Sequence, residues 1–329
     1  MSSIHRSDDR LQESTEMTTI DAETKPTGKG WKIGLWAAQL ALAAMFLMAG
    51  ITKLTSSPAD MVAMGMAWAE NAPVGLIRRD ESTPSIALGS QKTTLIVLHA
   101  GATKPVEAPF TGMYHIAIGG RSQTEFSWIL ARLLHLNIRV GPTDHLLAKS
   151  LYLTDPDGLE IEITFETPER FGHYGDMSGG LTLYDVEGRP HSGRGPLDVP
   201  AELRHAEGAD PMEAMADDSY LAHLHFKVAS LEPALDWFET LGFQRHLTLS
   251  HWGFADMGAG RPKTHRFAMN IWAGPNRPAA PSDMARLLRY ELIADDPAVL
   301  TNAPLKHAGT VLRGIDPTGV GVTLRSAAT

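Results

Sequence analysis

The stretch DHLLAKSLYLTDPDGLEIEITFE, residues 144–166, places His145 and Tyr152 before a tight turn and Glu160 and Glu162 after it. Asp, Pro and Gly each favour turn geometry, and apolar residues alternate with polar ones on both sides of DPDG. This pattern predicts a β-hairpin. Because alternate residues of a strand face the same way, Glu160 and Glu162 share one face of it.

Length and composition exclude several functions. At 329 residues the chain can bury more than one core, so we expect two domains. A net charge of -9, with no basic face in the sequence, argues against a nucleic-acid partner. The absence of cysteine excludes disulfides, thiolate metal sites and cysteine nucleophiles. Any metal ligands are therefore nitrogen and oxygen, which 14 histidines and 38 carboxylates can supply.

The N-terminal part has a different character. Residues 1–30 are polar and predict a disordered tail. Residues 33–51 carry no charge and are long enough to cross a bilayer, so we expect a transmembrane helix rather than a buried globular one. The flanking lysines leave its orientation open. We expect a membrane-associated protein whose soluble domain is cytoplasmic.

A resemblance supports the membrane assignment of this region. The run FLMAGITKLTSSPADMVAMGMAWAENAP lies within residues 31–79, which resemble a fragment of the DoxX-like membrane family. The family has four such helices, and the resemblance stops after one. The resemblance implies a membrane segment over residues 31–82. It gives no basis for assigning the family's function to this chain.

The rest of the chain predicts an α+β fold. A hairpin is expected near residues 86–100, then a strand, a helix that begins at Ser122, and a second hairpin. The order strand, helix, strands recurs after residue 220. We therefore expect paired βαβββ modules, with an N-terminal domain over 83–170 whose first module is truncated, an irregular linker over 171–217 and a C-terminal domain over 218–329.

An internal repeat supports the modular organisation. DPDGLEIEI, from Asp155, corresponds to DPTGVGVTL, from Asp316, and MYHIAI corresponds to LRYELI. The scaffold positions are shared, but His115 and Glu162 in one copy correspond to tyrosine and threonine in the other. A scaffold alone would not require this difference.

His115 and Glu162 form a candidate metal site. On its strand His115 shares a face with Ala117 and Gly119, which leaves open space above it. If the module curls into a cup, its first and last strands present His115 and Glu162 to one cavity. Two histidines and one carboxylate form the facial triad of non-haem iron sites. The alternative is a hydrogen-bonded core histidine with the glutamates on a solvent face.

The surrounding residues resemble a known family. Thr143-x-His145, Leu151-Tyr152, Asp155-Pro156-x-Gly158 and Glu162 resemble the signature of the extradiol dioxygenases, within the vicinal oxygen chelate superfamily. The runs LAHLHFKVASLEPALDWFETLGF and NIWAG resemble its catechol 2,3-dioxygenase subgroup. The resemblance implies that His115 and Glu162 bind Fe(II), with Mn(II) as the alternative. It also implies that His145 acts as acid and base, that Tyr152 donates a hydrogen bond near the substrate oxygens, and that the substrates are a small catechol-like aromatic and O2.

The chain departs from the family at the third ligand. The preceding module should supply a second histidine, but no histidine lies between His5 and His99. We expect His223 as the third metal ligand, with His99 or a neighbouring chain of a homo-oligomer as substitutes; His265 has a weaker claim. Two other functions stay open. One is a glyoxalase-like metal-dependent lyase or isomerase, and the other is a non-catalytic binding module or fused remnant.

Overall fold

A computed structural model of the chain describes residues 75–80, 85–90, 92–208, 210, 215–259 and 265–327. All of these residues belong to one compact unit. The expected tail and the expected membrane-spanning helix, residues 33–51, lie outside the described residues. Within the described ranges, no helix combines the length and apolar character needed to cross a bilayer. The membrane anchor and the domain boundaries stay predictions.

Three βαβββ modules follow one another along the chain. The first comprises β4 (Gly112–Gly119), α3 (Gln123–His135), β5 (Gly141–Asp144), β6 (Ala148–Thr154) and β7 (Glu160–Glu166). The second comprises β12 (Tyr220–Lys227), α5 (Leu231–Glu239), β13 (Gln244–Leu249), β14 (Phe254–Gly258) and β15 (Phe267–Asn270). The third comprises β16 (Arg289–Ala294), α6 (Ala298–Asn302), β17 (Lys306–Ala308), β18 (Val311–Ile315) and β19 (Gly321–Ser326). In each module the first strand pairs in parallel with the last.

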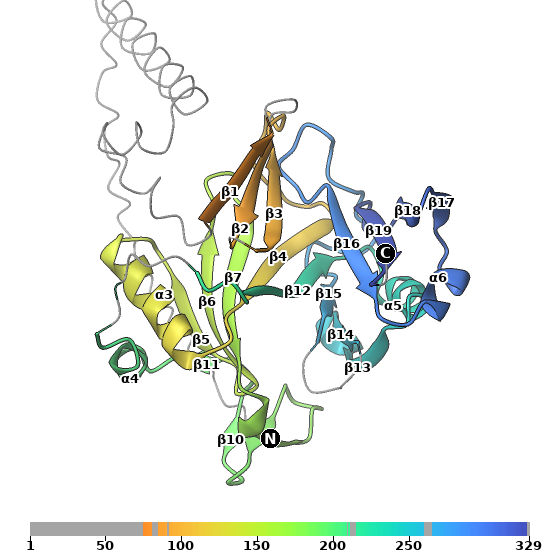
Figure 1. Ribbon diagram of the computed structural model, residues 1–329. Helices are drawn as coiled ribbons and strands as arrows, with labels where there is room; N and C mark the ends of the chain where they lie inside the picture. Colours follow the sequence, from red (N-terminus) through yellow and green to blue (C-terminus); the bar gives the residue numbers. More distant parts are fainter. Residues whose placement is uncertain are drawn as a thin grey trace, which may run out of the picture. The chain divides into compact units, whose positions relative to one another are not determined.

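The first and second modules share one sheet. Its nine strands have the order β11-β5-β6-β7-β4-β12-β15-β14-β13, and the two modules meet where β4 and β12 pair antiparallel (Figure 1). A separate three-stranded sheet precedes them, formed by β1 (Gly75–Asp80), β2 (Ser85–Gly89) and β3 (Thr94–His99). β2 and β3 form the hairpin predicted near residues 86–100.

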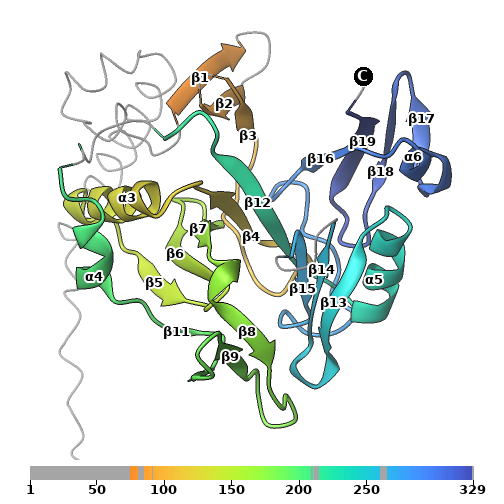
Figure 2. The same ribbon diagram turned by 60° about the horizontal axis from the view of Figure 1, so that its bottom comes forward.

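Helix α3 forms where the sequence predicts it. The Ser122 side chain caps α3 by accepting from the backbone N–H of Glu125 at 3.1 Å. The apolar face of α3 includes Phe126, Ile129 and Leu133, which are fully buried in one hydrophobic cluster with residues of β6 and β7. Figure 2 shows α3 beside these strands, with α4 (Val199–Arg204) next to it.

The expected linker, residues 171–217, is more regular than predicted. It contains β8 (Phe171–Tyr174), β9 (Leu183–Asp185), β10 (Pro190–His191), β11 (Gly195–Pro196) and α4. β8 to β10 form a small sheet, and β11 pairs with β5 at the edge of the nine-stranded sheet. Many of its turn residues favour irregular structure locally, so only pairing with distant strands makes the segment regular.

The internal repeat is visible in the turns. Asp155 Oδ1 accepts from the backbone N–H of Leu159 at 2.7 Å, and Asp316 Oδ1 accepts from that of Val320 at 3.0 Å. In the third module the hydroxyl of Tyr290, which corresponds to His115, donates to Asp316 Oδ2 at 3.1 Å. Tyr290 is buried in the core. The third module therefore keeps the scaffold and uses these positions for packing.

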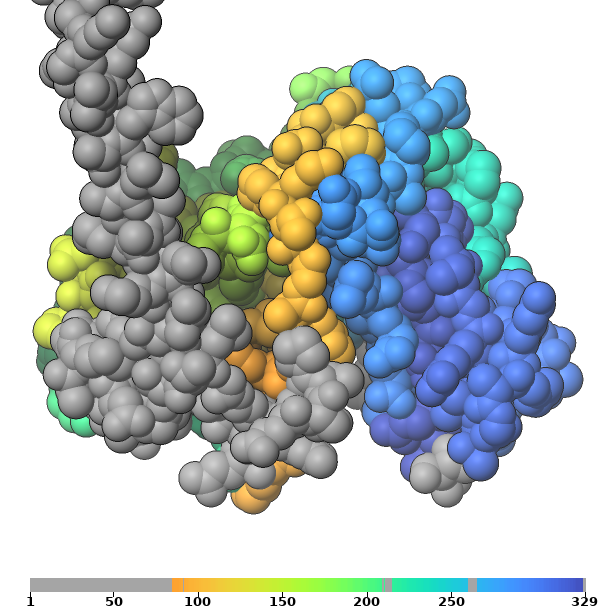
Figure 3. Space-filling view, turned by 90° about the horizontal axis from the view of Figure 1, so that it is seen from above, coloured from red at the N-terminus to blue at the C-terminus, as the bar shows by residue number. Residues whose placement is uncertain are grey.

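The connection between β3 and β4 is held by the connection that precedes β16. In Figure 3 the orange residues that lead into β4 run along blue residues of the C-terminal half. The backbone N–H of Thr111 donates to the carbonyl of Pro278 at 2.9 Å, and that of Ala285 donates to the carbonyl of Lys104 at 2.9 Å. These bonds fix the start of β4, the strand that carries His115.

Candidate metal centre

Strand register builds the centre. Ala117 of β4 pairs with Glu162 of β7 on one side and with His223 of β12 on the other. Directly paired residues project from the same face of a sheet, so these side chains lie above one surface. His115, two residues before Ala117, projects from that face as well. The small Ala117 side chain forms the floor between the three larger groups.

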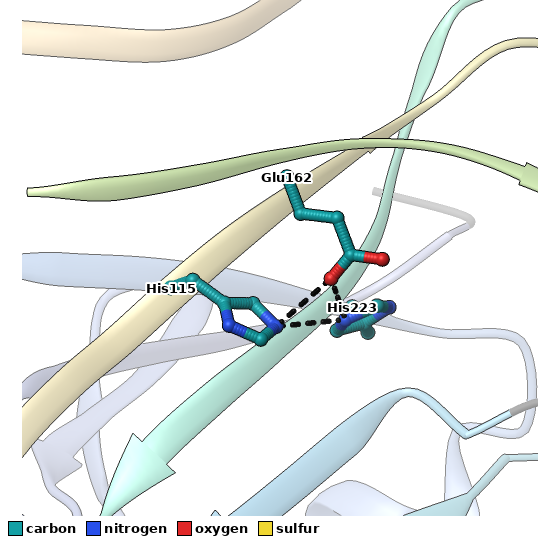
Figure 4. A group of neighbouring side chains, drawn as sticks. All are labelled: His115, Glu162 and His223. Carbon is teal, nitrogen blue, oxygen red and sulfur yellow. Dashed lines mark hydrogen bonds and ion pairs between the residues drawn. The ribbon is translucent and has the colours of Figure 1, made fainter. Parts of the chain in front are cut away.

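Three donor atoms converge above Ala117. His115 Nε2 lies 3.0 Å from Glu162 Oε2, His223 Nε2 lies 3.2 Å from the same oxygen, and the two ring nitrogens are 3.1 Å apart (Figure 4). Three ligands in mutually cis positions about 2.1 Å from an ion are about 3.0 Å from one another. The residues therefore fit a divalent ion in facial coordination.

The two buried members of the group, His115 and Glu162, have shifted pKa values. His115 and Glu162 are buried, and the Ser150 hydroxyl donates to Glu162 Oε1 at 2.5 Å, which leaves Oε2 to face the histidines. Burial raises the pKa of Glu162, but His223 and His115 outweigh this effect and hold it well below its usual range. Burial lowers the pKa of His115, and Glu160 and Glu162 reverse this, so the net shift is upward.

Glu160 supports His115 from behind. Its Oε1 lies 3.5 Å from His115 Nδ1, the ring nitrogen that faces away from Glu162. A carboxylate near the second nitrogen of a ligating histidine fixes the ring and its tautomer. The two glutamates of the opening stretch therefore differ in position: Glu162 joins the donor cluster, and Glu160 lies behind one of its histidines.

His145 and Tyr152 meet beside this cluster. Tyr152 pairs with Glu162 in the register of β6 and β7. His145 Nδ1 lies 2.7 Å from the carbonyl oxygen of Gly193, so Nδ1 carries the proton and donates it. His145 Nε2, 2.9 Å from the Tyr152 hydroxyl, therefore accepts from it. Burial lowers the pKa of His145, so its imidazole is neutral and ready to receive a proton.

Two further histidines of the second module lie next to the cluster. The His265 ring centroid is 4.4 Å from that of His223, and its Nδ1 lies 3.5 Å from Asp256 Oδ2. His225 is buried, and the Asn270 amide donates to its Nε2 at 2.9 Å. Burial lowers the pKa of both histidines well below its usual range. Strand alternation could have found His225, two residues after His223, but no local pattern marks His265.

Two features of β4 do not follow from strand alternation. The space above Gly119 is filled, because a Cβ there would lie 2.5 Å from Cε1 of Tyr220. Alternation alone would also place Tyr114 on the face opposite His115. A bulge between β4 and β12 instead brings the Tyr114 ring to 4.8 Å from that of His225 and 5.6 Å from that of Trp272. Bulges turn two successive side chains toward one face, and sequence alternation does not reveal them.

The third donor comes from the same chain. His223 completes the one group of three potential ligands found in the described ranges. His99, the expected substitute, is an exposed residue at the end of β3 and is not part of this group. His223 reaches this group from β12, a strand of the following module that pairs with β4.

Comparison with known proteins gives a relative in sequence. The chain is similar to the catechol-2,3-dioxygenase of Bacillus subtilis strain 168. The two are 29% identical over 229 residues, which covers 66% of this chain and 74% of the relative. No family model matches the chain, and no comparison supports the expected DoxX-like segment.

The solved structures that the chain resembles are more distant. A Bacillus subtilis protein to which a dioxygenase activity has been ascribed has a TM-score of 0.46 and 10% identity, covering 78% of each chain. A catechol 2,3-dioxygenase has a TM-score of 0.27 and 15% identity, covering 78% of this chain and 80% of that one. Both scores are low, so the candidate centre rests on its own geometry.

Proposed function

We propose that this chain is an Fe(II)-dependent extradiol-type ring-cleavage dioxygenase that acts on a catechol-like aromatic compound and O2. The observation that carries the proposal is the convergence of His115, Glu162 and His223 at cis-ligand spacing on a buried sheet face. Sequence similarity to a catechol-2,3-dioxygenase supports the same reaction class. Mn(II) is the alternative ion, since it accepts the same nitrogen and oxygen ligands.

The cluster itself defines where the reaction would occur. Three protein donors on one side leave the opposite positions of an ion free, and Fe(II) there would supply adjacent sites for both catechol oxygens and O2. Such a reaction breaks the ring bond between one hydroxyl-bearing carbon and the adjacent carbon that carries no hydroxyl. Both atoms of O2 enter the ring-opened product. Glu162 and the two histidines hold the centre, and the Ala117 floor leaves it room.

Protein side chains would then move the protons. When a catechol binds, the Tyr152 O–H can turn from His145 Nε2 toward a substrate oxygen that becomes negative during the reaction. Neutral His145 then has Nε2 free to take a proton from the catechol and return it to the product. His265, neutral and packed on His223, is a second candidate base on the opposite side.

Metal analysis together with oxygen uptake tests the proposal. The wild-type protein, loaded with iron without air and then dialysed, should hold about one iron per chain and consume O2 when catechol is added. His115→Ala and Glu162→Ala should lose the iron. The control His135→Gln removes an exposed histidine from the end of α3 and should keep it. Iron without oxygen use would instead indicate a glyoxalase-like enzyme, and neither would indicate a non-catalytic protein.

Variants of the two neutral histidines separate their roles. His145→Ala should keep iron and slow turnover by a factor of about 100 or more, the usual range for loss of a general base. His265→Ala is measured in parallel. If only the His265 variant slows, the base lies in the second module and the assignment of His145 is wrong.

A further inference from the structure

The loop between β10 and β11 brings a cation to the edge of the candidate centre. The Arg194 guanidinium lies over the ring of Tyr152, with its central carbon 5.6 Å from the ring centroid. The hydroxyl of that same ring contacts His145. Arg194 is an exposed residue in a segment that the sequence predicts as a linker, so only the tertiary structure brings it here.

The backbone holds Arg194 in this place from both sides. On one side, Gly193 accepts from His145 Nδ1 and donates its own N–H to His191 Nδ1 at 3.0 Å. Gly193 has φ of 73°, and a Cβ there would lie 2.4 Å from a methyl carbon of Leu181, so glycine is required. On the other side, Gly195 pairs with Asp144 of β5. The loop is therefore anchored to His145 itself and to β5, the strand that ends directly before it.

The charge of Arg194 is not neutralised by a protein carboxylate. Within the described part of the chain, no acidic group lies within ion-pair distance of its guanidinium, whereas neighbouring Arg170 and Arg189 pair with Asp144 and Asp185. The positive charge of Arg194 still acts on Tyr152, beside the candidate centre. Burial raises the pKa of Tyr152, and the charge of Arg194 opposes that rise. An unpaired guanidinium beside a substrate site is a ready partner for a carboxylate, which it can bind through two parallel hydrogen bonds.

We propose that Arg194 recognises an anionic substituent, and that the substrate is a catechol whose ring carries a carboxylate. This inference rests on the proposed function for the identity of the ring and deepens it by naming the substituent. Catechol oxygens bound at the centre lie next to Tyr152 and His145, and a ring substituent directed toward the Tyr152 face meets the guanidinium.

Ligand binding without oxygen tests this inference separately from turnover. Full-length protein with iron added is titrated calorimetrically with 2,3- and 3,4-dihydroxybenzoate, each compared with its uncharged amide. We expect one acid to bind at least about 10-fold more tightly than its amide, because charge-assisted hydrogen bonds are among the stronger ones. Arg194→Gln should abolish that preference and leave amide affinity within about twofold.

The matched control is Arg189→Gln, which removes the same charge from the neighbouring β9–β10 turn. It should keep the preference of the wild type. Three results overturn the inference. The first is a wild-type protein with no preference for either acid, and the second is a preference that survives in Arg194→Gln. The third is an equal loss of acid and amide binding in Arg194→Gln, which would mean that Arg194 only steadies Tyr152. Oxygen uptake on unsubstituted catechol reports on the proposed function independently, so the two can fail separately.

Discussion

Replacing Ala117 with leucine should expel the metal while leaving every proposed ligand in place. Ala117 is fully buried and lies in register between Glu162 and His223. Paired Cβ atoms across neighbouring strands are about 4.5–5.5 Å apart. The donor atoms above Ala117 are 3.0–3.2 Å apart, which leaves room for an ion about 2.1 Å from each. A carbon atom needs about 3.5–4.0 Å from its neighbours, so a leucine side chain and an ion cannot share this space.

The size of the effect follows from this exclusion. Loss of a group that only supports a ligand typically reduces metal affinity by about 10- to 100-fold, and filling the ion's own space should reduce it by more, so we expect at least a 100-fold loss, about 2.8 kcal/mol. Added carbon in a packed region should also lower the free energy of unfolding by about 1–3 kcal/mol. The assay is iron per chain after dialysis, with circular dichroism to check folding. The control Ala117→Gly removes the methyl group and should keep iron. Wild-type iron content in a folded Ala117→Leu protein would refute the placement of the ion.

Three further predictions concern groups around the centre. Glu160→Gln should weaken iron binding by about 10-fold or more, because His115 loses its supporting carboxylate; an unchanged affinity would show that the 3.5 Å contact has no role. Burial raises the pKa of Asp256 from 3.8 to about 6. The folded protein therefore holds this proton more tightly than the unfolded chain, and the free energy of unfolding should fall by about 3 kcal/mol as the pH rises from 3.8 through about 6. Urea unfolding of Asp256→Asn between pH 4 and 7 should lack this dependence, and an identical pH profile for both proteins would contradict it. Glu202→Ala should lower the free energy of unfolding by about 3 kcal/mol, because it leaves partly buried Lys149 without its buried partner; Glu202→Gln should cost less, and equal losses would argue against an ionic contribution.

Local patterns in the sequence were sufficient for much of the first module. The DPDG turn, the alternation around it and the Ser122 cap predict β6, β7 and α3, and the structure has all three. The same alternation puts Glu160 and Glu162 on one face, as observed. These features depend on residues within one turn or one strand, where backbone preferences and side-chain periodicity act directly.

Local patterns also misled in identifiable places. The bulge that turns Tyr114 toward His225 depends on how β4 pairs with β12, and the ring that fills the space above Gly119 comes from Tyr220. Residues 171–217 predict irregular structure, yet Gly193 and Arg194 of this segment lie against His145 and Tyr152. In each case the partner is far away in the chain, so nothing near the residue records it.

The sequence alone determined that the chain repeats a βαβββ scaffold and that His115 and Glu162 lie on the first and last strands of one module, but it left open whether the two side chains face one cavity. Only the tertiary structure decided which residue completes the group. The sequence leaves His223, His99 and a neighbouring chain as candidates. Strands pair through backbone hydrogen bonds, which do not depend on side-chain identity, so the sequence does not show which strand lies beside β4. Pairing of β4 with β12 selects His223. This pairing depends on the packing of two modules in one continuous sheet. Its free energy is a sum over contacts between residues far apart in the chain, so no short stretch of sequence shows it.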